Sequence, residues 1–178
     1  SSASFATMAY SSKARKEAEA TECAGELGGN EKFWAYLNRL NEVTPLVMRN
    51  LAFSPDVQLY GSYVPFQSFE FAPSQEVILY AEVDNFKSDY VPNKGYFTSF
   101  RGRYVILDSA GQEVASQVFN KIEENCRVLR RDFFINCRLS MPKRINPGKY
   151  TLKLTVEDNL AKKMAQESIS FTVKDVAP

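Results

Sequence analysis

Apolar and polar residues alternate with a period of two over most of the chain, from Val57 to Val173. Successive side chains of a strand point to opposite faces of a sheet, so this alternation indicates strands that are buried on one face. The pattern is clearest between Tyr150 and Val156. Strands are predicted at 57–64, 66–71, 77–84, 97–107, 113–121, 133–141, 150–156 and 169–173.

Short, turn-rich connections separate the predicted strands. Residues 108–112, which include Gly111, are typical of a hairpin connection between two strands. No helical segment intervenes between the strands, which favours antiparallel pairing, and antiparallel sheets of this kind pack face to face. The pattern predicts a mainly β fold over 54–178, an immunoglobulin-like antiparallel β-sandwich with an α-helical N-terminal extension.

The periodicity is different before residue 54. Asn30 is a suitable N-cap residue, and the residues that follow at spacings of three and four predict an amphipathic helix with one apolar stripe: Phe33, Leu37, Leu40, Thr44, Val47 and Leu51. Pro45 is expected to interrupt it and to begin a second short helix that ends near residue 50. We therefore expect 30–53 to be a helical extension packing on the sandwich. The alternative is a docking helix for a partner.

The first 29 residues are rich in Ala, Ser, Glu and Lys and contain few large apolar side chains. The glycine pair at 28–29 ends the helix-forming composition, so 1–29 is interpreted as a polar linker or a marginal helix. It lacks the charged start and long apolar run of a signal peptide. No stretch of the chain approaches the roughly 20 apolar residues that a membrane span needs.

Charge and residue usage narrow the functional classes. The 22 basic and 21 acidic residues give a net charge of +1, which provides no field to attract nucleic acid. Histidine is absent, which removes the commonest general base and metal ligand. A non-catalytic protein without cofactor or metal is expected.

The three cysteines, Cys23, Cys126 and Cys137, form neither a disulfide framework nor a zinc motif. If the chain made a tight hairpin near Leu129, Cys137 would lie too far along its strand to bond with Cys126.

The segment 147–156, PGKYTLKLTV, resembles the penultimate strand of immunoglobulin-like and fibronectin-like modules in bacterial surface and exported proteins. In those folds a tyrosine at the position of Tyr150 can hydrogen bond back to nearby backbone. With segments 77–86, 102–104 and 130–134, it is similar to a family of uncharacterised bacterial proteins predicted to be exported. The resemblance covers about 57–173 and implies an extracytoplasmic module, in the periplasm or at the cell surface. No functional residue can be assigned from this resemblance.

Arginine side chains form the first candidate binding site, because guanidinium groups bind carboxylate or phosphate at two points. A predicted turn carries three of them, and two more share one face of a strand that could pass nearby. These residues are Arg101, Arg103, Arg127, Arg130 and Arg131, with Asp132 beside them. The simpler interpretation is a solvated turn whose charge is balanced by neighbouring carboxylates.

Aromatic residues form the second candidate. Tyr90 lies within the predicted loop 85–95, and Tyr96 follows it directly. Exposed tyrosines are common platforms for sugars and for protein partners, whereas other aromatic residues in this half of the chain are expected in the core.

These patterns lead to two functional hypotheses. The first is a non-catalytic structural or interaction module of an exported or cell-envelope bacterial protein, which contacts a protein or polysaccharide partner. The alternative is an anionic-ligand or carbohydrate-binding domain, less readily a hydrolytic one, built on the arginine-rich turn and the loop aromatics. It requires Arg101, Arg127, Arg130 and Asp132 to converge in one concave pocket. The sequence does not predict an oligomeric state.

Overall fold

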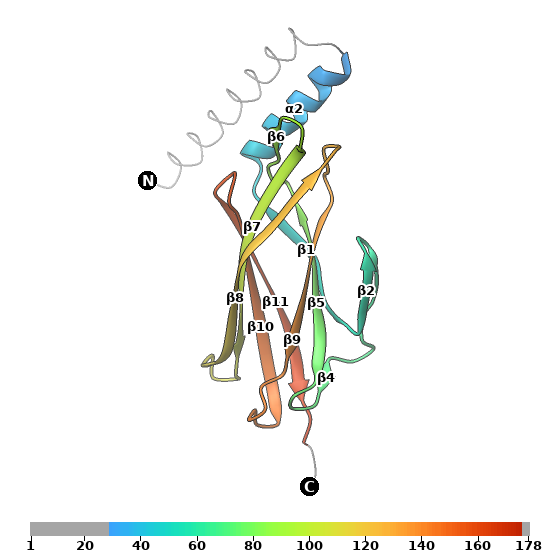
Figure 1. Cartoon of the computed structure of the whole chain (residues 1–178). Helices are drawn as coiled ribbons and strands as arrows, with labels where there is room; N and C mark the ends of the chain where they lie inside the picture. The colour runs from blue at the N-terminus through green and yellow to red at the C-terminus, as the bar shows by residue number, and fades with distance from the viewer. Residues whose placement is uncertain (1–28, 176–178) are drawn as a thin grey trace, which may run out of the picture.

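The computed structural model in Figure 1 describes residues 29–175, so the expected polar linker at 1–29 lies outside the described range except for Gly29. The described chain is mainly β, with one helix, α2 (Gly29–Val43), followed by strands. The strands are β1 (Val47–Ser54), β2 (Asp56–Leu59), β3 (Ser62–Val64), β4 (Glu70–Phe71), β5 (Glu76–Asp84), β6 (Asp89–Val91), β7 (Gly95–Leu107), β8 (Glu113–Cys126), β9 (Phe133–Ser140), β10 (Gly148–Asp158) and β11 (Lys163–Val173).

The strands form two large sheets and a small hairpin. One sheet has three antiparallel strands in the order β1-β5-β9. The other has six strands, in the order β4-β11-β10-β7-β6, with β8 also paired to β7. Only β4 and β11 run parallel within these described sheets, and β2 and β3 pair as a separate hairpin. The strands predicted from 77 onward are confirmed, including the hairpin of β7 and β8.

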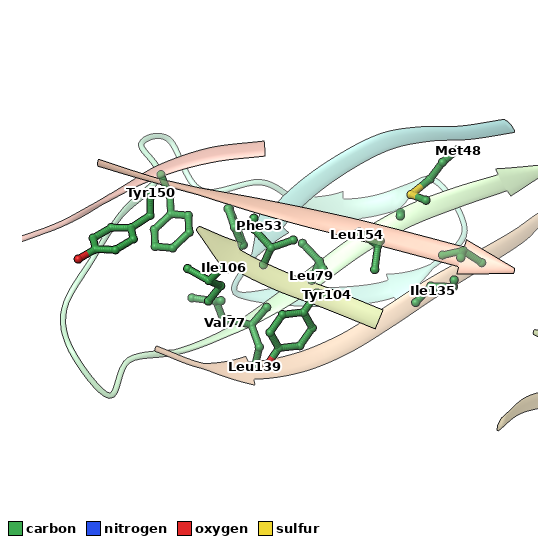
Figure 2. Packing of buried hydrophobic residues seen from close by; sticks show 14 of the residues in the cluster. Met48, Phe53, Val77, Leu79, Tyr104, Ile106, Ile135, Leu139, Tyr150 and Leu154 are labelled. Atoms are coloured by element: carbon green, nitrogen blue, oxygen red, sulfur yellow. The ribbon is translucent and has the colours of Figure 1, made fainter. Parts of the chain in front are cut away.

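The two large sheets share one hydrophobic core, part of which is shown in Figure 2. The alternation that predicted β10 is reproduced in its burial, because Leu152, Leu154 and Val156 are fully buried. Aromatic rings join the sheets directly. The ring of Phe53 in β1 lies 5.6 Å from that of Phe171 in β11, and Phe100 in β7 lies 4.6 Å from Phe133 in β9.

The prediction of a second short helix after Pro45 is wrong, because residues 47–54 form the edge strand β1. A β-bulge explains the misleading pattern. The pairing of β1 with β5 shifts between Arg49 and Ala52, and Asn50 within this bulge has a positive φ of 53°. An extra residue in a strand changes the phase of its alternation, so Met48 and Phe53, five residues apart, both belong to the core. The strict period of two is therefore missing from 47–54, whereas Val47 and Leu51 stand at a helical spacing in the sequence.

The connection between β8 and β9 is not a tight hairpin. β8 pairs with β7 in the six-stranded sheet, whereas β9 pairs with β5 in the three-stranded sheet. The loop therefore crosses from one sheet to the other. Cys126 and Cys137 lie in different sheets as free thiols, and burial raises the pKa of Cys137.

The start of β10 carries the backbone contact that the sequence suggested for Tyr150. Its hydroxyl donates a hydrogen bond of 2.8 Å to the carbonyl oxygen of Asn146, four residues earlier. The ring is buried against Phe171. This contact fixes the turn that precedes the strand.

Candidate binding surfaces

The end of the molecule next to α2 in Figure 1 collects most of the residues that the sequence singled out. We call this end the apical surface. It consists of Phe33, Tyr90, Tyr96, Arg127, Val128, Arg130, Arg131 and Asp132. Pairing in the six-stranded sheet brings these segments together. Tyr90 in β6 lies opposite Tyr96 in β7, and Tyr96 in turn lies opposite Cys126, which immediately precedes Arg127.

Large apolar side chains are exposed on the apical surface. Tyr90 is 65% exposed and Val128 is 66% exposed, and the ring of Tyr90 meets that of Tyr96 edge to face at 5.5 Å. The turn before β7 requires Gly95, which has a φ of 86°, because a Cβ atom there would lie 2.3 Å from the carbonyl oxygen of Cys126. The start of β7 therefore lies directly against the backbone at Cys126 and Arg127.

The arginines of the apical surface are held in different ways. The Nη1 atom of Arg130 lies 2.9 Å from a carboxylate oxygen of Glu124, and its Nε atom lies 3.7 Å from Asp132. The guanidinium carbon of Arg131 lies 5.9 Å from the ring centre of Phe33 on α2, which is 55% exposed. Arg127 is exposed. The loop therefore presents positive charge among exposed apolar groups.

Arg101 and Arg103 lie elsewhere, on the outer face of the six-stranded sheet. The Nε atom of Arg101 donates a 2.7 Å hydrogen bond to Glu157, and Arg103 pairs with Glu113 at 3.1 Å. With the exposed side chains of Val118 and Met164, both arginines line a hollow of about 230 Å³.

Strand alternation explains why the arginines do not meet. Glu124, which holds Arg130, lies opposite Thr98 in β7, and Thr98 and Arg101 are three residues apart, so they point to opposite faces of the sheet. The structure therefore brings Arg130 and Asp132 together and places Arg101 on the other face.

A groove of about 610 Å³ lies at the end of the molecule opposite α2, and we call it the basal groove. Three parts of the chain form it: the segment 68–70, the turn residues 108–109, and side chains of β10 and β11 that include Lys149, Thr151, Ser170 and Thr172. No pattern in the sequence was interpreted as this groove. Its signal was present in the polar positions of 150–156 and 169–173, which were interpreted only as solvent-facing.

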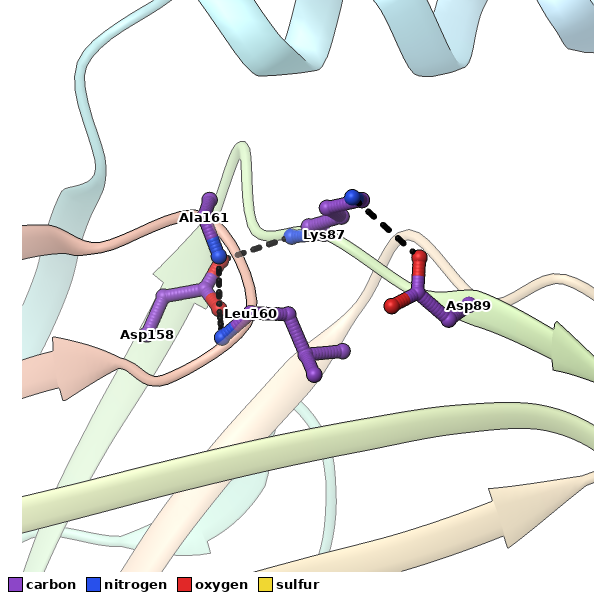
Figure 3. Close-up of polar contacts among 5 residues, drawn as sticks. All are labelled: Lys87, Asp89, Asp158, Leu160 and Ala161. Carbon is purple, nitrogen blue, oxygen red and sulfur yellow. Dashed lines mark hydrogen bonds and ion pairs between the residues drawn. The ribbon is translucent and has the colours of Figure 1, made fainter.

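A buried carboxylate organises the loops beneath the apical surface, as Figure 3 shows. Asp158 is fully buried at the end of β10 and accepts hydrogen bonds of 2.8–3.0 Å from the backbone N–H groups of Lys87, Leu160 and Ala161. The Nζ atom of Lys87 lies 3.3 Å from Asp89 at the start of β6. Asp158 therefore joins the turn between β10 and β11 to the segment that leads into β6.

A second polar cluster fastens the β2–β3 hairpin to the three-stranded sheet. Tyr80 is fully buried, donates a 2.8 Å hydrogen bond to Glu82 and accepts one from the N–H group of Gly61 in the hairpin. Its ring stacks on that of Tyr63 at 4.1 Å. Burial raises the pKa of Tyr80 to about 12; the bond from Gly61 opposes this shift and the carboxylate of Glu82 adds to it. The side-chain amide of Asn50, in the β1 bulge, also donates to Glu82.

Metal sites and membrane-spanning helices are two further features that residues 29–175 could contain. No group of three or more Cys, Asp or Glu side chains is placed there to hold a metal ion. In the same range, no helix combines the length and the apolar character that crossing a bilayer requires.

No protein-family model and no curated protein sequence matches the chain. Among solved structures, it is similar to the alkylpurine DNA glycosylase AlkC of Pseudomonas fluorescens, with 11% identity and a TM-score of 0.42. That similarity covers 87% of this chain and 42% of the glycosylase, so the chain spans less than half of its length.

Two other solved structures show likeness at a similar level. The C-terminal domain of wzt is 16% identical, with a TM-score of 0.45 over 74% of this chain and 75% of that domain. A family 123 glycoside hydrolase from Clostridium perfringens is 10% identical, with a TM-score of 0.46 over 75% of this chain and 28% of the hydrolase. At these identities and TM-scores the neighbours carry no conclusion about activity.

Proposed function

We propose that the chain is an immunoglobulin-like β-sandwich that acts as a non-catalytic interaction module. Two observations support the fold assignment. The order β1-β5-β9 opposite β11-β10-β7-β8 matches strands A, B and E opposite G, F, C and C′ of immunoglobulin-type domains. The bond from Tyr150 to the Asn146 carbonyl occupies the place of the tyrosine corner at the start of strand F.

The apical surface is the proposed binding site, and the exposure of Tyr90 and Val128 next to Arg127 is the observation that carries this proposal. Tyrosine and arginine are enriched at the centres of protein interfaces, where they supply large contact areas and two-point hydrogen bonds. Arg101, Arg103 and Arg130 already pair with carboxylates in the chain itself, which favours a protein partner over a small anion. The partner is a protein that presents an apolar surface with a carboxylate for Arg127.

The proposed setting is an exported or cell-envelope bacterial protein. The support is the resemblance of 57–173 to bacterial proteins predicted to be exported. Fractionation of the source cells with an antibody against the chain tests this setting separately from binding. Recovery in the envelope or periplasmic fraction is expected, and recovery only with the cytosolic marker contradicts it.

The binding site is tested by comparing two surface variants. One carries Tyr90→Ser and Arg127→Glu on the apical surface, and the matched control carries Val118→Ser and Met164→Ser, exposed residues on the outer face of the six-stranded sheet. A protein captured from envelope extract by the unaltered chain is purified and titrated against all three by calorimetry. The proposal expects the apical variant alone to lose about tenfold or more in affinity. Equal binding by the apical variant, or a loss only in the control, contradicts it.

A further inference from the structure

The floor of the basal groove is built from outward-pointing side chains of two paired strands. Thr151 in β10 lies opposite Ser170 in β11, and Lys149 lies opposite Thr172. Thr172 is in turn paired with Glu70 in β4, which extends the floor to the edge of the sheet. These side chains point away from the core because their neighbours in sequence, Tyr150 and Phe171, point into it. A sheet face therefore forms the floor of an open groove.

Two loops raise the walls of the groove. The turn after β7 contributes residues 108–109 on one side, and residues 68–69, which lead into β4, contribute the other. Asp108 shapes the turn, because its Oδ1 atom accepts hydrogen bonds of 2.9 and 2.8 Å from the N–H groups of Ala110 and Gln112. At about 610 Å³, the groove is within the range of about 300–1,000 Å³ that is usual for small-ligand sites.

The charges around the groove balance. Glu70 lies 3.5 Å from the Nζ atom of Lys174, and Asp108 opposes Lys149, for which the described residues provide no ion pair. Two carboxylates and two ammonium groups give no net field, so a strongly charged ligand such as a phosphate gains little there. This distinguishes the basal groove from the arginine-bearing apical surface.

The polar groups of the groove suit a polyhydroxylated ligand. Thr151, Ser170 and Thr172 place three hydroxyl groups on the floor, and a hydroxyl can donate or accept a hydrogen bond. Sugar hydroxyls have the same dual character. The half-buried ring of Phe69, which packs edge to face on Phe53 at 5.3 Å, adds an apolar contact of the kind that the C–H face of a sugar ring makes with aromatic residues.

We propose that the basal groove is a binding site for a neutral oligosaccharide. This site lies at the end of the molecule opposite the apical surface, and it does not depend on the protein partner proposed for that surface. Lys149 and the hydroxyl groups of β10 and β11 bind the sugar hydroxyls, and Phe69 contacts the apolar face of one sugar ring.

The test is a titration of the ¹⁵N-labelled full chain, followed by amide chemical shifts, with maltotriose, cellotriose and triacetylchitotriose up to about 10 mM each. Inorganic phosphate is titrated as the charged probe. The proposal expects at least one trisaccharide to cause saturable shifts at 68–70, 108–109, 149–151 and 170–172, without changes at the apical residues. Phosphate is expected to leave these amides unshifted.

A variant and its matched control make the result specific. Lys149→Ala with Ser170→Val removes two polar groups from the groove. The control, Lys153→Ala with Ser168→Val, makes the same kinds of substitution further along the same face, at two residues that lie opposite each other outside the groove. Affinity is expected to fall about tenfold or more in the first variant and to stay unchanged in the second.

Three outcomes overturn the proposal: no saturable shift with any of the three sugars, equal affinity in the groove variant, or shifts at the groove caused by phosphate alone. Amide spectra outside the groove show whether each variant is folded. Loss of the apical partner leaves this result unaffected, so the two proposals fail separately.

Discussion

At the scale of single residues, the Tyr150 hydroxyl ties β10 to the turn before it through the Asn146 carbonyl. Tyr150→Phe removes this hydrogen bond and leaves the buried ring in place. We expect the free energy of unfolding to fall by about 1 kcal/mol, the usual net value of one hydrogen bond, in urea denaturation. Tyr90→Phe, at an exposed tyrosine on the apical surface, is the control and should change stability little. Equal stability of the unaltered chain and Tyr150→Phe contradicts the structural role.

Gly102 is required because another side chain occupies the space where its Cβ atom would lie. A Cβ atom there would come within 2.0 Å of the ring of Phe119, which packs across the strand pair of β7 and β8. Gly102→Ala is expected to cost about 1–3 kcal/mol, as overpacking usually does. Phe119→Leu should remove most of this conflict, so a double-mutant cycle by urea denaturation should show a coupling between the two sites. Additive effects would mean that the ring does not lie over Gly102.

Tyr80 gives the chain a pH dependence at alkaline pH. Its pKa is raised from 10.0 to about 12 in the folded state, so folding favours the protonated hydroxyl. The contribution of this pKa shift to the free energy of unfolding is fully present below pH 10 and is lost as the pH rises from 10 towards 12. Tyr80→Phe, although destabilised at neutral pH by its lost hydrogen bonds, should show a smaller decrease over this interval. Parallel stability curves for both proteins between pH 10 and 12 would contradict this origin.

At the scale of elements, the strands after residue 76 could be predicted because their alternation is uninterrupted and their turns are short. The segment 47–54 could not, because the bulge at Asn50 interrupts the alternation and leaves the core residues Met48 and Phe53 five residues apart. The passage of the chain from β8 in one sheet to β9 in the other could not be predicted either, since a local pattern does not reveal which sheet the next strand joins.

The helix α2 is attached at its C-terminal end. Lys163, the first residue of β11, donates hydrogen bonds to the carbonyl oxygens of Asn41 and Asn85, and the side-chain amide of Asn85 donates one to the carbonyl oxygen of Pro45. A cation at the C-terminal end of a helix also interacts favourably with the helix dipole. Lys163→Met is therefore expected to accelerate amide hydrogen exchange in α2 and leave β5 and β10 unchanged. Unchanged exchange in α2 would show that other contacts hold it.

At the scale of the whole molecule, the candidate sites depend on strand register, which the sequence leaves open. Residue types alone indicated the arginine and tyrosine residues of the apical surface. The separation of Arg101 from Arg130 follows from Glu124 lying opposite Thr98, a pairing that the sequence does not specify. The basal groove joins the paired strands β10 and β11 to the segments 68–70 and 108–109, which are far from them in the sequence, so no local motif could indicate it.

The same register supports every proposal above, because the apical surface and the basal groove both exist only if the two sheets close on one core. The most direct test is nuclear Overhauser spectroscopy of the phenylalanine rings in the labelled chain. The account predicts contacts between Phe53 and Phe171 and between Phe100 and Phe133, each of which joins the two sheets. Absence of both contacts in the folded chain, or backbone contacts that pair β8 directly with β9, would contradict it.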